Sequence, residues 1–222
     1  DVAIRGVLHR GESQSWGRGG RIMTQASATW NRGLIEGNLG TGFDVLEEGT
    51  QAELTNIVIR DNQGVQEDDM AGEGLEVAFG AELKLKQGLL SNNRGLGLAL
   101  DDAGSLANLE DVVILDTGSI PQSQELGVGI QVSYGAQLTA ERLVLDGNTT
   151  GGVNIALLDS FARVDDFAIL NTLPQESDGA FGMGICAQQR ARIDLNRGLV
   201  ANNRDHGVLA SGQGTQVNHV EV

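Results

Sequence analysis

Short stretches of the chain alternate apolar with polar residues, and this alternation predicts β-strands. In residues 81–86 (A-E-L-K-L-K), alanine and leucine occupy every second position and charged residues lie between them. A hydrophobic period of two is that of a strand with one buried face. No segment has helical spacing long enough for a helix that crosses between strands, so the pattern predicts an all-β chain.

An internal repeat, marked by a Gly-x-Gly motif, runs through the whole chain. The motif and its two degenerate copies begin at Gly17, Gly40, Gly72, Gly95, Gly127, Thr150, Gly182 and Asp205. Successive copies are 23, 32, 23, 32, 23, 32 and 23 residues apart, so the true repeat is a pair of units that spans 55 residues. Each unit holds three short apolar stretches, which predicts one turn of a three-sided coil.

Like residues recur at like positions of the repeat, which predicts coils stacked in register. One column consists of Ala26, Ala81, Ala136 and Ala191. A second column, at the last turn of each coil, consists of Asn38, Asn62, Asn93, Thr117, Asn148, Thr172 and Asn203. Because an amide side chain both donates and accepts hydrogen bonds, we expect the stacked copies to form an asparagine ladder.

Residues 1–222 are expected to form a single segment of four 55-residue, two-coil repeats. Glu221 and Val222 align with Asp1 and Val2, four repeats earlier, so the chain starts and stops at the same phase. Complete solenoids carry capping elements over their end coils, and neither end of this sequence has one. We therefore expect a piece of a longer array.

The motif G-x-G-h-x-V-x-x-G-A-x-L-x-L, where h is hydrophobic, resembles the right-handed parallel β-helix repeat family with the pectin-lyase-like fold. It is most similar to tandem-repeat bacterial surface proteins, such as those of myxobacteria. The resemblance covers the whole chain. It implies an all-β, right-handed, single-stranded parallel β-helix of about eight coils, with alternating 23- and 32-residue coils, and an extracellular or cell-surface location. It is unspecific for activity, because the family includes lyases, hydrolases and adhesins.

The charge and composition of the chain limit the classes of partner that it can bind. The formal net charge is −15, with only two lysines, Lys84 and Lys86. Such a surface repels phosphate, which excludes a nucleic-acid partner and disfavours anionic membranes. No apolar run approaches the roughly 18 residues that span a bilayer, so we expect no membrane insertion. The single cysteine, Cys186, excludes an internal disulfide and is interpreted as an incidental thiol.

No catalytic set stands out. Enzymes of the resembled family place calcium-binding acids and a basic residue, or three aspartates with His and Arg or Lys, on the outward face of neighbouring strands. The corresponding outward column here is Arg21, Asp44, Glu76, Ala99, Gln131, Asn154, Cys186 and Leu209. It holds no three adjacent carboxylates, and His9, His206 and His219 lie in different columns. We expect no catalytic residue, no cofactor and no enzymatic activity within this segment.

An acidic turn follows the first strand of the long coils. Its members are Glu47, Glu48, Asp101, Asp102 and Asp159. Consecutive long coils lie two strand spacings apart, about 9.6 Å, which is too far for one ion to bridge their carboxylates directly. Each pair is a weak candidate for its own Ca²⁺, and a solvated acidic turn is the favoured interpretation.

The long coils add a loop after the ladder position, and the added loops span 63–71, 118–126 and 173–181, with 8–16 as the incomplete first copy. They are expected to project from one side and to offer a binding edge for a glycan or protein. The candidate contact residues are Gln66, Glu67, Asp68, Gln122, Gln124, Gln175 and Glu176.

Aromatic and apolar residues close these loops or recur elsewhere in register. Trp16, Leu126 and Phe181 close three of the loops, and we expect them to fold back onto the coil as lids. Phe79 and Tyr134 recur in the short coils, where they suggest a sugar-stacking platform. Strand parity instead points both rings inward, so we expect them to pack in the core.

Three functions remain open. The first is a non-catalytic β-solenoid of a secreted or cell-surface bacterial protein, serving as a spacer, adhesin or envelope component. The second is a carbohydrate-active protein of the lyase or hydrolase type, with its active site outside this segment. The third is a carbohydrate-binding module that uses the stacked loop edge.

Overall fold

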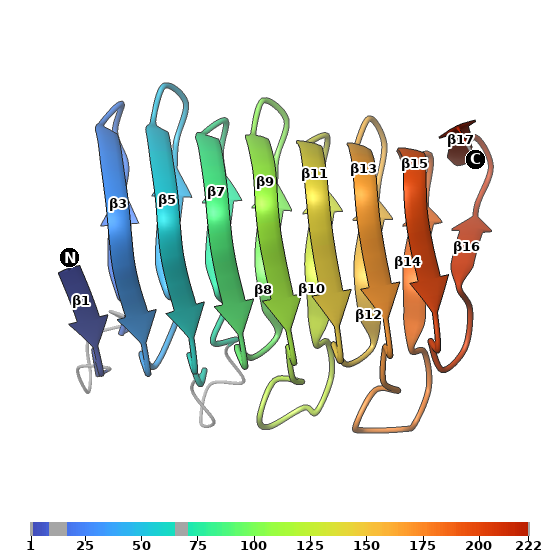
Figure 1. Cartoon of the computed structure of the whole chain (residues 1–222), viewed down its shortest axis with the longest axis horizontal. Coiled ribbons are helices and arrows are strands. Elements are labelled where there is room, and N and C mark those ends of the chain that lie inside the picture. Colours follow the sequence, from blue (N-terminus) through green and yellow to red (C-terminus); the bar gives the residue numbers. More distant parts are fainter. Residues whose placement is uncertain (1, 9–16, 65–70, 222) are drawn as a thin grey trace.

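The computed structural model describes residues 2–8, 17–64 and 71–221, and every regular element in them is a β-strand. These residues include no helix long and apolar enough to cross a membrane. The strands form two all-parallel sheets that lie against each other along a solenoid (Figure 1). The predicted all-β parallel β-helix of about eight coils is thereby confirmed.

Strands alternate between the two sheets along the chain. The nine-stranded sheet contains, in spatial order, β1 (Val2–Arg5), β3 (Ser27–Glu36), β5 (Gln51–Arg60), β7 (Glu82–Ser91), β9 (Leu106–Leu115), β11 (Gln137–Asp146), β13 (Phe161–Leu170), β15 (Arg192–Ala201) and β17 (Gln216–Glu221). The eight-stranded sheet contains β2 (Gly20–Ile22), β4 (Phe43–Leu46), β6 (Leu75–Ala78), β8 (Leu96–Asp101), β10 (Val128–Ser133), β12 (Gly151–Ala156), β14 (Met183–Gln188) and β16 (Val208–Ser211).

Strand pairing reproduces the repeat lengths read from the sequence. In the eight-stranded sheet, paired residues such as Phe43 and Leu75 are 32 positions apart, and Leu75 and Leu98 are 23 apart. In the nine-stranded sheet the separations become 24 and 31, as for Gln51 with Ser27 and with Glu82. The difference of one arises because the long coils carry one extra residue at the turn between the sheets.

The predicted third strand of each coil is not separate, and this corrects the three-sided coil. Each of the ten-residue strands instead contains one residue with positive φ, such as Asn56 (55°) in β5. Pairing skips this residue, and burial shifts phase there, because Ala52 and Leu54 are buried before it and Ile57 and Ile59 after it. After this single left-handed residue, the odd-numbered instead of the even-numbered positions of β5 point inward. The two predicted strands therefore form one continuous strand.

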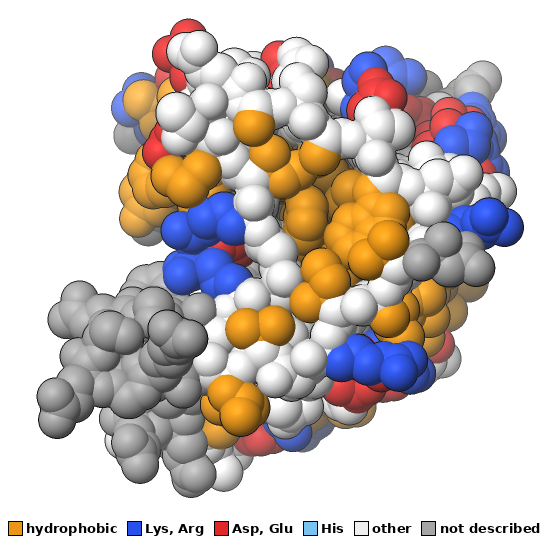
Figure 2. All heavy atoms as spheres, turned by 90° about the vertical axis from the view of Figure 1, so that its left-hand side faces the viewer, with side chains coloured by type: hydrophobic (Ala, Val, Ile, Leu, Met, Phe, Trp, Pro, Cys, Tyr) orange, Lys and Arg blue, Asp and Glu red, His pale blue; other side chains and the backbone are white. Residues whose placement is uncertain are grey.

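The core is a continuous apolar column between the two sheets. It is built mainly from leucine, isoleucine, valine and alanine, and Ala81, Ala136 and Ala191 of the predicted alanine column are fully buried in it. Ala26, in the first described coil, is exposed. Seen from the N-terminal end, apolar side chains gather in the middle of the molecule (Figure 2).

The asparagine ladder is present, and its strength varies along the solenoid. Asn38 Nδ2 donates to Asn62 Oδ1 at 2.9 Å, and Asn62 Nδ2 donates to Asn93 Oδ1 at 2.8 Å. At Thr117 and Thr172 this amide chain is interrupted, although both backbone N–H groups still donate to the asparagine of the next coil. Both threonine hydroxyls are buried without a hydrogen-bond partner among the described residues. The continuous amide ladder therefore lies in the N-terminal half.

A second polar column, missed in the sequence, fixes the turns between the sheets. Thr50, Ser105 and Ser160 of the long coils are buried beside the alanine column. Their hydroxyls accept hydrogen bonds from turn amides of the preceding short coil, for example from Gly80 N to Ser105 Oγ at 2.9 Å and from Gly135 N to Ser160 Oγ at 3.0 Å. Each hydroxyl satisfies an amide that would otherwise lack a partner.

Phe79 and Tyr134 do not pack in the core, which overturns the expectation from strand parity. Their side chains are 60% and 63% exposed. Both residues lie one position beyond the end of a strand, in turns where their φ values are 58° and 55°. The alternation of a strand no longer applies there, so the rings point to solvent.

Candidate ligand-binding surfaces

The outer face of the eight-stranded sheet carries the outward column predicted from the sequence. Strand pairing joins all eight members in order, from Arg21 and Asp44 at one end to Cys186 and Leu209 at the other. Asp44, Ala99 and Cys186 are nevertheless buried. Neighbouring side chains therefore cover parts of this face, which creates environments of low polarity outside the main core.

Four carboxylates gather on the N-terminal half of this face. Asp44 and Glu76 are paired neighbours of the column, while Glu73 precedes β6 and Asp101 ends β8. Because two of the four lie outside the column, the inspection of that column missed the cluster. Thr41 Oγ1 donates to Glu73 Oε2 at 3.4 Å, and the Ser133 hydroxyl donates to Asp101.

Two arginines reach the buried Asp44. Arg18 Nε lies 2.6 Å from Asp44 Oδ2, and Arg21 approaches the same oxygen with Nε at 2.8 Å and a terminal nitrogen at 2.6 Å. A carboxylate that is fully removed from water requires such charged partners. The pairing therefore anchors the first described coils to each other.

Burial and mutual repulsion raise the pKa values of these carboxyl groups. Burial is the main cause at Glu73, where the nearby Glu76, Asp44 and Asp101 add to it and bring the pKa to about 8. Burial and Asp44 raise the pKa of Glu76 to about 7. Burial also raises the pKa of Asp44 and of Asp101, against the effect of Arg18 and Arg21 at the former. Glu73 thus retains its proton at neutral pH, so the cluster carries less negative charge than its composition implies.

A groove of about 380 Å³ occupies the C-terminal half of the same face. Its apolar lining includes Leu126, Val128, Phe181 and Met183. Its polar lining includes the amides of Gln131, Asn154, Gln175 and Gln188. Apolar walls with a few convergent polar groups are typical of small-molecule and ligand sites. The four clustered carboxylates do not line this groove.

Asn154 lies at the centre of the column that lines this groove. Its Nδ2 donates to Gln131 Oε1 at 2.8 Å, across one strand spacing. Its Oδ1 is shielded from water and has no hydrogen-bond partner among the described residues. A buried acceptor without a donor costs about 1–3 kcal/mol.

The added loops stack on one side, as predicted, in the two copies that the structure describes (Figure 1). Ser177 N in the later loop donates to Gln124 O in the earlier loop at 3.1 Å. Gln122 and Glu176 are exposed, whereas Gln175 is buried and donates to Ser177 Oγ at 2.9 Å. The predicted contacts Gln66, Glu67 and Asp68 lie outside the described residues.

The apolar residues that close these loops, expected to fold back onto the coil as lids, line the groove. Leu126 and Phe181 both line the groove and remain 38% and 45% exposed. Both have positive φ values, 62° and 63°, and precede a glycine that is also left-handed. Trp16, the third predicted lid, lies outside the described residues.

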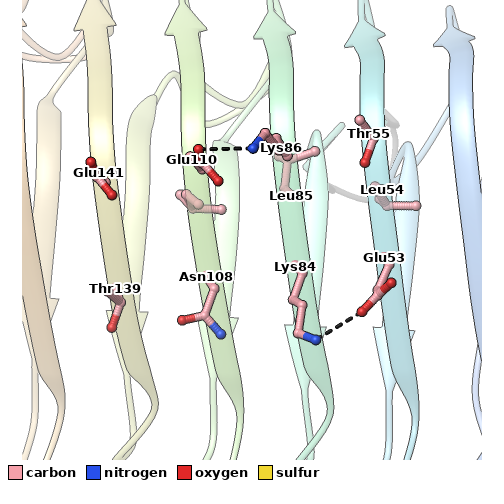
Figure 3. A pocket seen from close by; sticks show the side chains of 11 residues that line it. Glu53, Leu54, Thr55, Lys84, Leu85, Lys86, Asn108, Glu110, Thr139 and Glu141 are labelled. Carbon is pink, nitrogen blue, oxygen red and sulfur yellow. Dashed lines mark hydrogen bonds and ion pairs between the residues drawn. The ribbon is translucent and has the colours of Figure 1, made fainter.

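The outer face of the nine-stranded sheet carries a pocket of about 390 Å³ that is lined mainly by polar and charged side chains (Figure 3). Lys84 Nζ pairs with Glu53 Oε1 at 2.9 Å, and Lys86 Nζ pairs with Glu110 Oε1 at 3.0 Å. Arg142 also pairs with Glu110, at 2.6 Å. Exposed ion pairs of this kind contribute little stability, and they leave few free charges for a partner. This face offers a weaker candidate site than the groove.

The candidate calcium residues are spread over separate turns. Glu47 accepts a hydrogen bond from Thr24 Oγ1 at 3.1 Å, and Asp102 accepts one from Phe79 N at 3.3 Å. Asp101 belongs to the carboxylate cluster on the outer sheet face, while Glu48 and Asp159 are exposed. Within the described residues, no group of three or more His, Cys, Asp or Glu side chains could hold a metal ion.

The remaining chemically distinctive residues are isolated from one another. His206 Nδ1 lies 2.9 Å from Asp205 Oδ2 at the rim of the groove, and His219 is exposed on β17 opposite Leu195. His9 lies outside the described residues. Cys186 is a free, buried thiol in the lining of the groove, and burial raises its pKa, so it is a weak nucleophile.

Comparison with known proteins leaves the family of the chain open. No protein-family model matches it. No curated protein matches it either. Among solved structures, it is similar to a hyper-glycosylated fragment of TibA, glycosylated by TibC, with 11% sequence identity over 99% of this chain and 97% of that one. The TM-score is 0.16, and a likeness at that level carries no argument about function.

Proposed function

We propose that this chain is a non-catalytic, glycan-binding segment of a β-solenoid in a secreted or cell-surface bacterial protein. The glycan would lie in the groove on the outer face of the eight-stranded sheet. This deepens one of the three functions open from the sequence, with the binding site moved from the stacked loop edge to the groove beside it. The secreted or surface location rests on the resemblance of the repeat motif.

The groove itself is the observation that supports this proposal. Its walls include the exposed ring of Phe181 and the side chain of Leu126, which can pack against the C–H face of a sugar. Its lining also includes the amides of Gln131, Asn154, Gln175 and Gln188, a group that can bond to sugar hydroxyls. Amides outnumber charged groups in the lining, so the ligand class that fits is an uncharged polysaccharide.

A glycan array followed by calorimetry on the best neutral oligosaccharide tests the proposal. Phe181→Ala should weaken binding about tenfold, which corresponds to about 1.4 kcal/mol of lost stacking. Asn154→Leu should weaken it by a similar factor, because it removes the amide from the lining. The matched control is Leu199→Ala, which removes an exposed apolar side chain of the nine-stranded sheet outside the groove. Silence on the array, or equal binding by Phe181→Ala and the parent chain, would contradict the proposal.

A carbohydrate-active protein of the lyase or hydrolase type, with its active site outside residues 1–222, is the second candidate. The shape of the groove favours it, since a substrate chain could extend along the same sheet face into neighbouring coils. Incubation of the purified segment with polyuronates, with absorbance of unsaturated products as the readout, tests the non-catalytic part of the proposal. Steady product formation would overturn it.

A further inference from the structure

The turns that lead from the eight-stranded to the nine-stranded sheet form an exposed edge on the far side from the long loops, at the top of Figure 1. In successive coils this edge presents Glu47, Phe79, Asp102 and Tyr134, which we call the turn ridge. The ridge is separate from the groove. From the sequence, Phe79 and Tyr134 were expected in the core and Glu47 and Asp102 in a solvated acidic turn. Its two aromatic rings are among the most exposed large apolar side chains of the described residues.

Phe79 and Tyr134 have the same local structure. Each follows the last residue of its strand, has φ of 58° or 55°, and precedes a glycine with φ of 84° or 87°. Each following glycine amide is fixed by a buried serine hydroxyl, Ser105 or Ser160. Because the backbone is the same at both positions, both Cα–Cβ bonds point in the same direction. The two side chains therefore start from equivalent backbone positions two coils apart, about 10 Å.

Carboxylates alternate with these rings. Phe79 N donates to Asp102 Oδ2 at 3.3 Å, which places this carboxylate directly in the coil between Phe79 and Tyr134. Glu47 occupies the equivalent turn one coil before Phe79, where Thr24 Oγ1 donates to it at 3.1 Å. The order along the solenoid is thus acid, ring, acid, ring, with steps of about 5 Å. The ridge combines a stacking surface with negative charge.

We propose that the turn ridge binds an extended amino-glycan, a β-1,4-linked chain of glucosamine units with free ammonium groups. Such a chain presents the same sugar face at every second unit, so its faces repeat at about the spacing of the two rings. Its ammonium groups complement the carboxylates between the rings, and they are attracted by a chain of net charge −15. A basic proline-rich peptide matches the charge as well, but such peptides dock into grooves, and the ridge is an outward edge.

Calorimetry with a glucosamine oligomer, at a mildly acidic pH that keeps its amino groups protonated, tests this proposal. Phe79→Ala and Tyr134→Ala should each weaken binding about tenfold, and Asp102→Asn about fivefold, with a smaller salt dependence. Leu199→Ala is the matched control, because it removes a similarly exposed apolar side chain from β15 of the nine-stranded sheet, outside both the groove and the ridge, and should leave this binding unchanged. Circular dichroism of each variant should match that of the parent chain, since none of the three substituted side chains is buried.

Two further ligands, an N-acetylated oligomer and a basic proline-rich peptide, separate the contribution of the ammonium charge from that of the sugar rings. The fully N-acetylated oligomer lacks the ammonium groups and should bind about tenfold more weakly. Equal binding of both oligomers would overturn the proposal, and so would unchanged binding by the Phe79→Ala, Tyr134→Ala double variant. Tighter binding of a basic proline-rich peptide than of the glucosamine oligomer would also overturn it. The variants Phe181→Ala and Asn154→Leu test glycan binding in the groove with a different ligand. A negative result for the ridge is therefore distinguishable from a negative result for the groove.

Discussion

Replacement of Glu73 by glutamine should change how the stability of the chain depends on pH. In the folded chain, burial and three neighbouring carboxyl groups raise the pKa of Glu73 from its ordinary value of 4.5 to about 8. Between these two values the folded state holds a proton that the unfolded state has released. Glu73 alone therefore lowers the free energy of unfolding as pH rises, by up to about 1.4 kcal/mol per pH unit.

The size of the effect follows from this window. The full shift would correspond to about 5 kcal/mol, and the half-buried position of Glu73 together with the titration of its neighbour Glu76 reduces what one substitution can recover. The amide that replaces the carboxyl group carries no charge at any pH. We therefore expect the Glu73→Gln variant to gain about 2–4 kcal/mol relative to the parent chain when the pH is raised from about 5 to about 8.

Urea denaturation of both chains at several pH values in this range measures the difference. The midpoints should diverge in favour of the variant as the pH rises. The matched control is Glu176→Gln, a carboxylate in an exposed loop, which should show no such divergence. A difference between Glu73→Gln and the parent chain that stays constant across this pH range would refute the reasoning, because the proton linkage would then be absent.

Three further predictions concern packing and hydrogen bonding, and urea midpoints test each of them. Asn62→Ala should lower the free energy of unfolding by about 2–5 kcal/mol, because it leaves the buried Asn38 amide without its acceptor; a loss under about 1 kcal/mol would contradict this role. Thr117→Asn should raise it by about 1 kcal/mol, since the new amide extends the ladder where a buried hydroxyl now lacks a partner; destabilisation would show that the ladder cannot extend there. Gly198→Ala should cost about 1–3 kcal/mol because its Cβ would lie 2.2 Å from the Phe167 ring, and Gly207→Ala, with ordinary contacts only, is the control that should cost less.

The features that depend on vertical repetition could be predicted from the sequence. Alternating separations of 23 and 32 residues predicted the strand register, and the recurrence of Asn38, Asn62 and Asn93 predicted the ladder. Both depend only on which residues lie above one another. The outward column from Arg21 to Leu209 was placed correctly for the same reason.

Features that depend on where a strand ends could not be predicted from the hydrophobic alternation alone. Phe79 and Tyr134 were assigned to the core because the alternation was extended one residue past the strand end. A signal was present in the following Gly80 and Gly135, since paired left-handed residues mark a turn. Glu73 was missed for a related reason, because it precedes its strand and joins the cluster only through the path of the connecting segment.

The uneven asparagine ladder has a mechanical consequence. Where one amide bonds directly to the next, as from Asn38 through Asn62 to Asn93, adjacent coils share side-chain bonds in addition to those of the sheets. At Thr117 and Thr172 the side chain makes no hydrogen bond to the next coil. Under force along the solenoid axis, adjacent coils should therefore separate first at these threonine coils. The C-terminal half should have the lower stiffness.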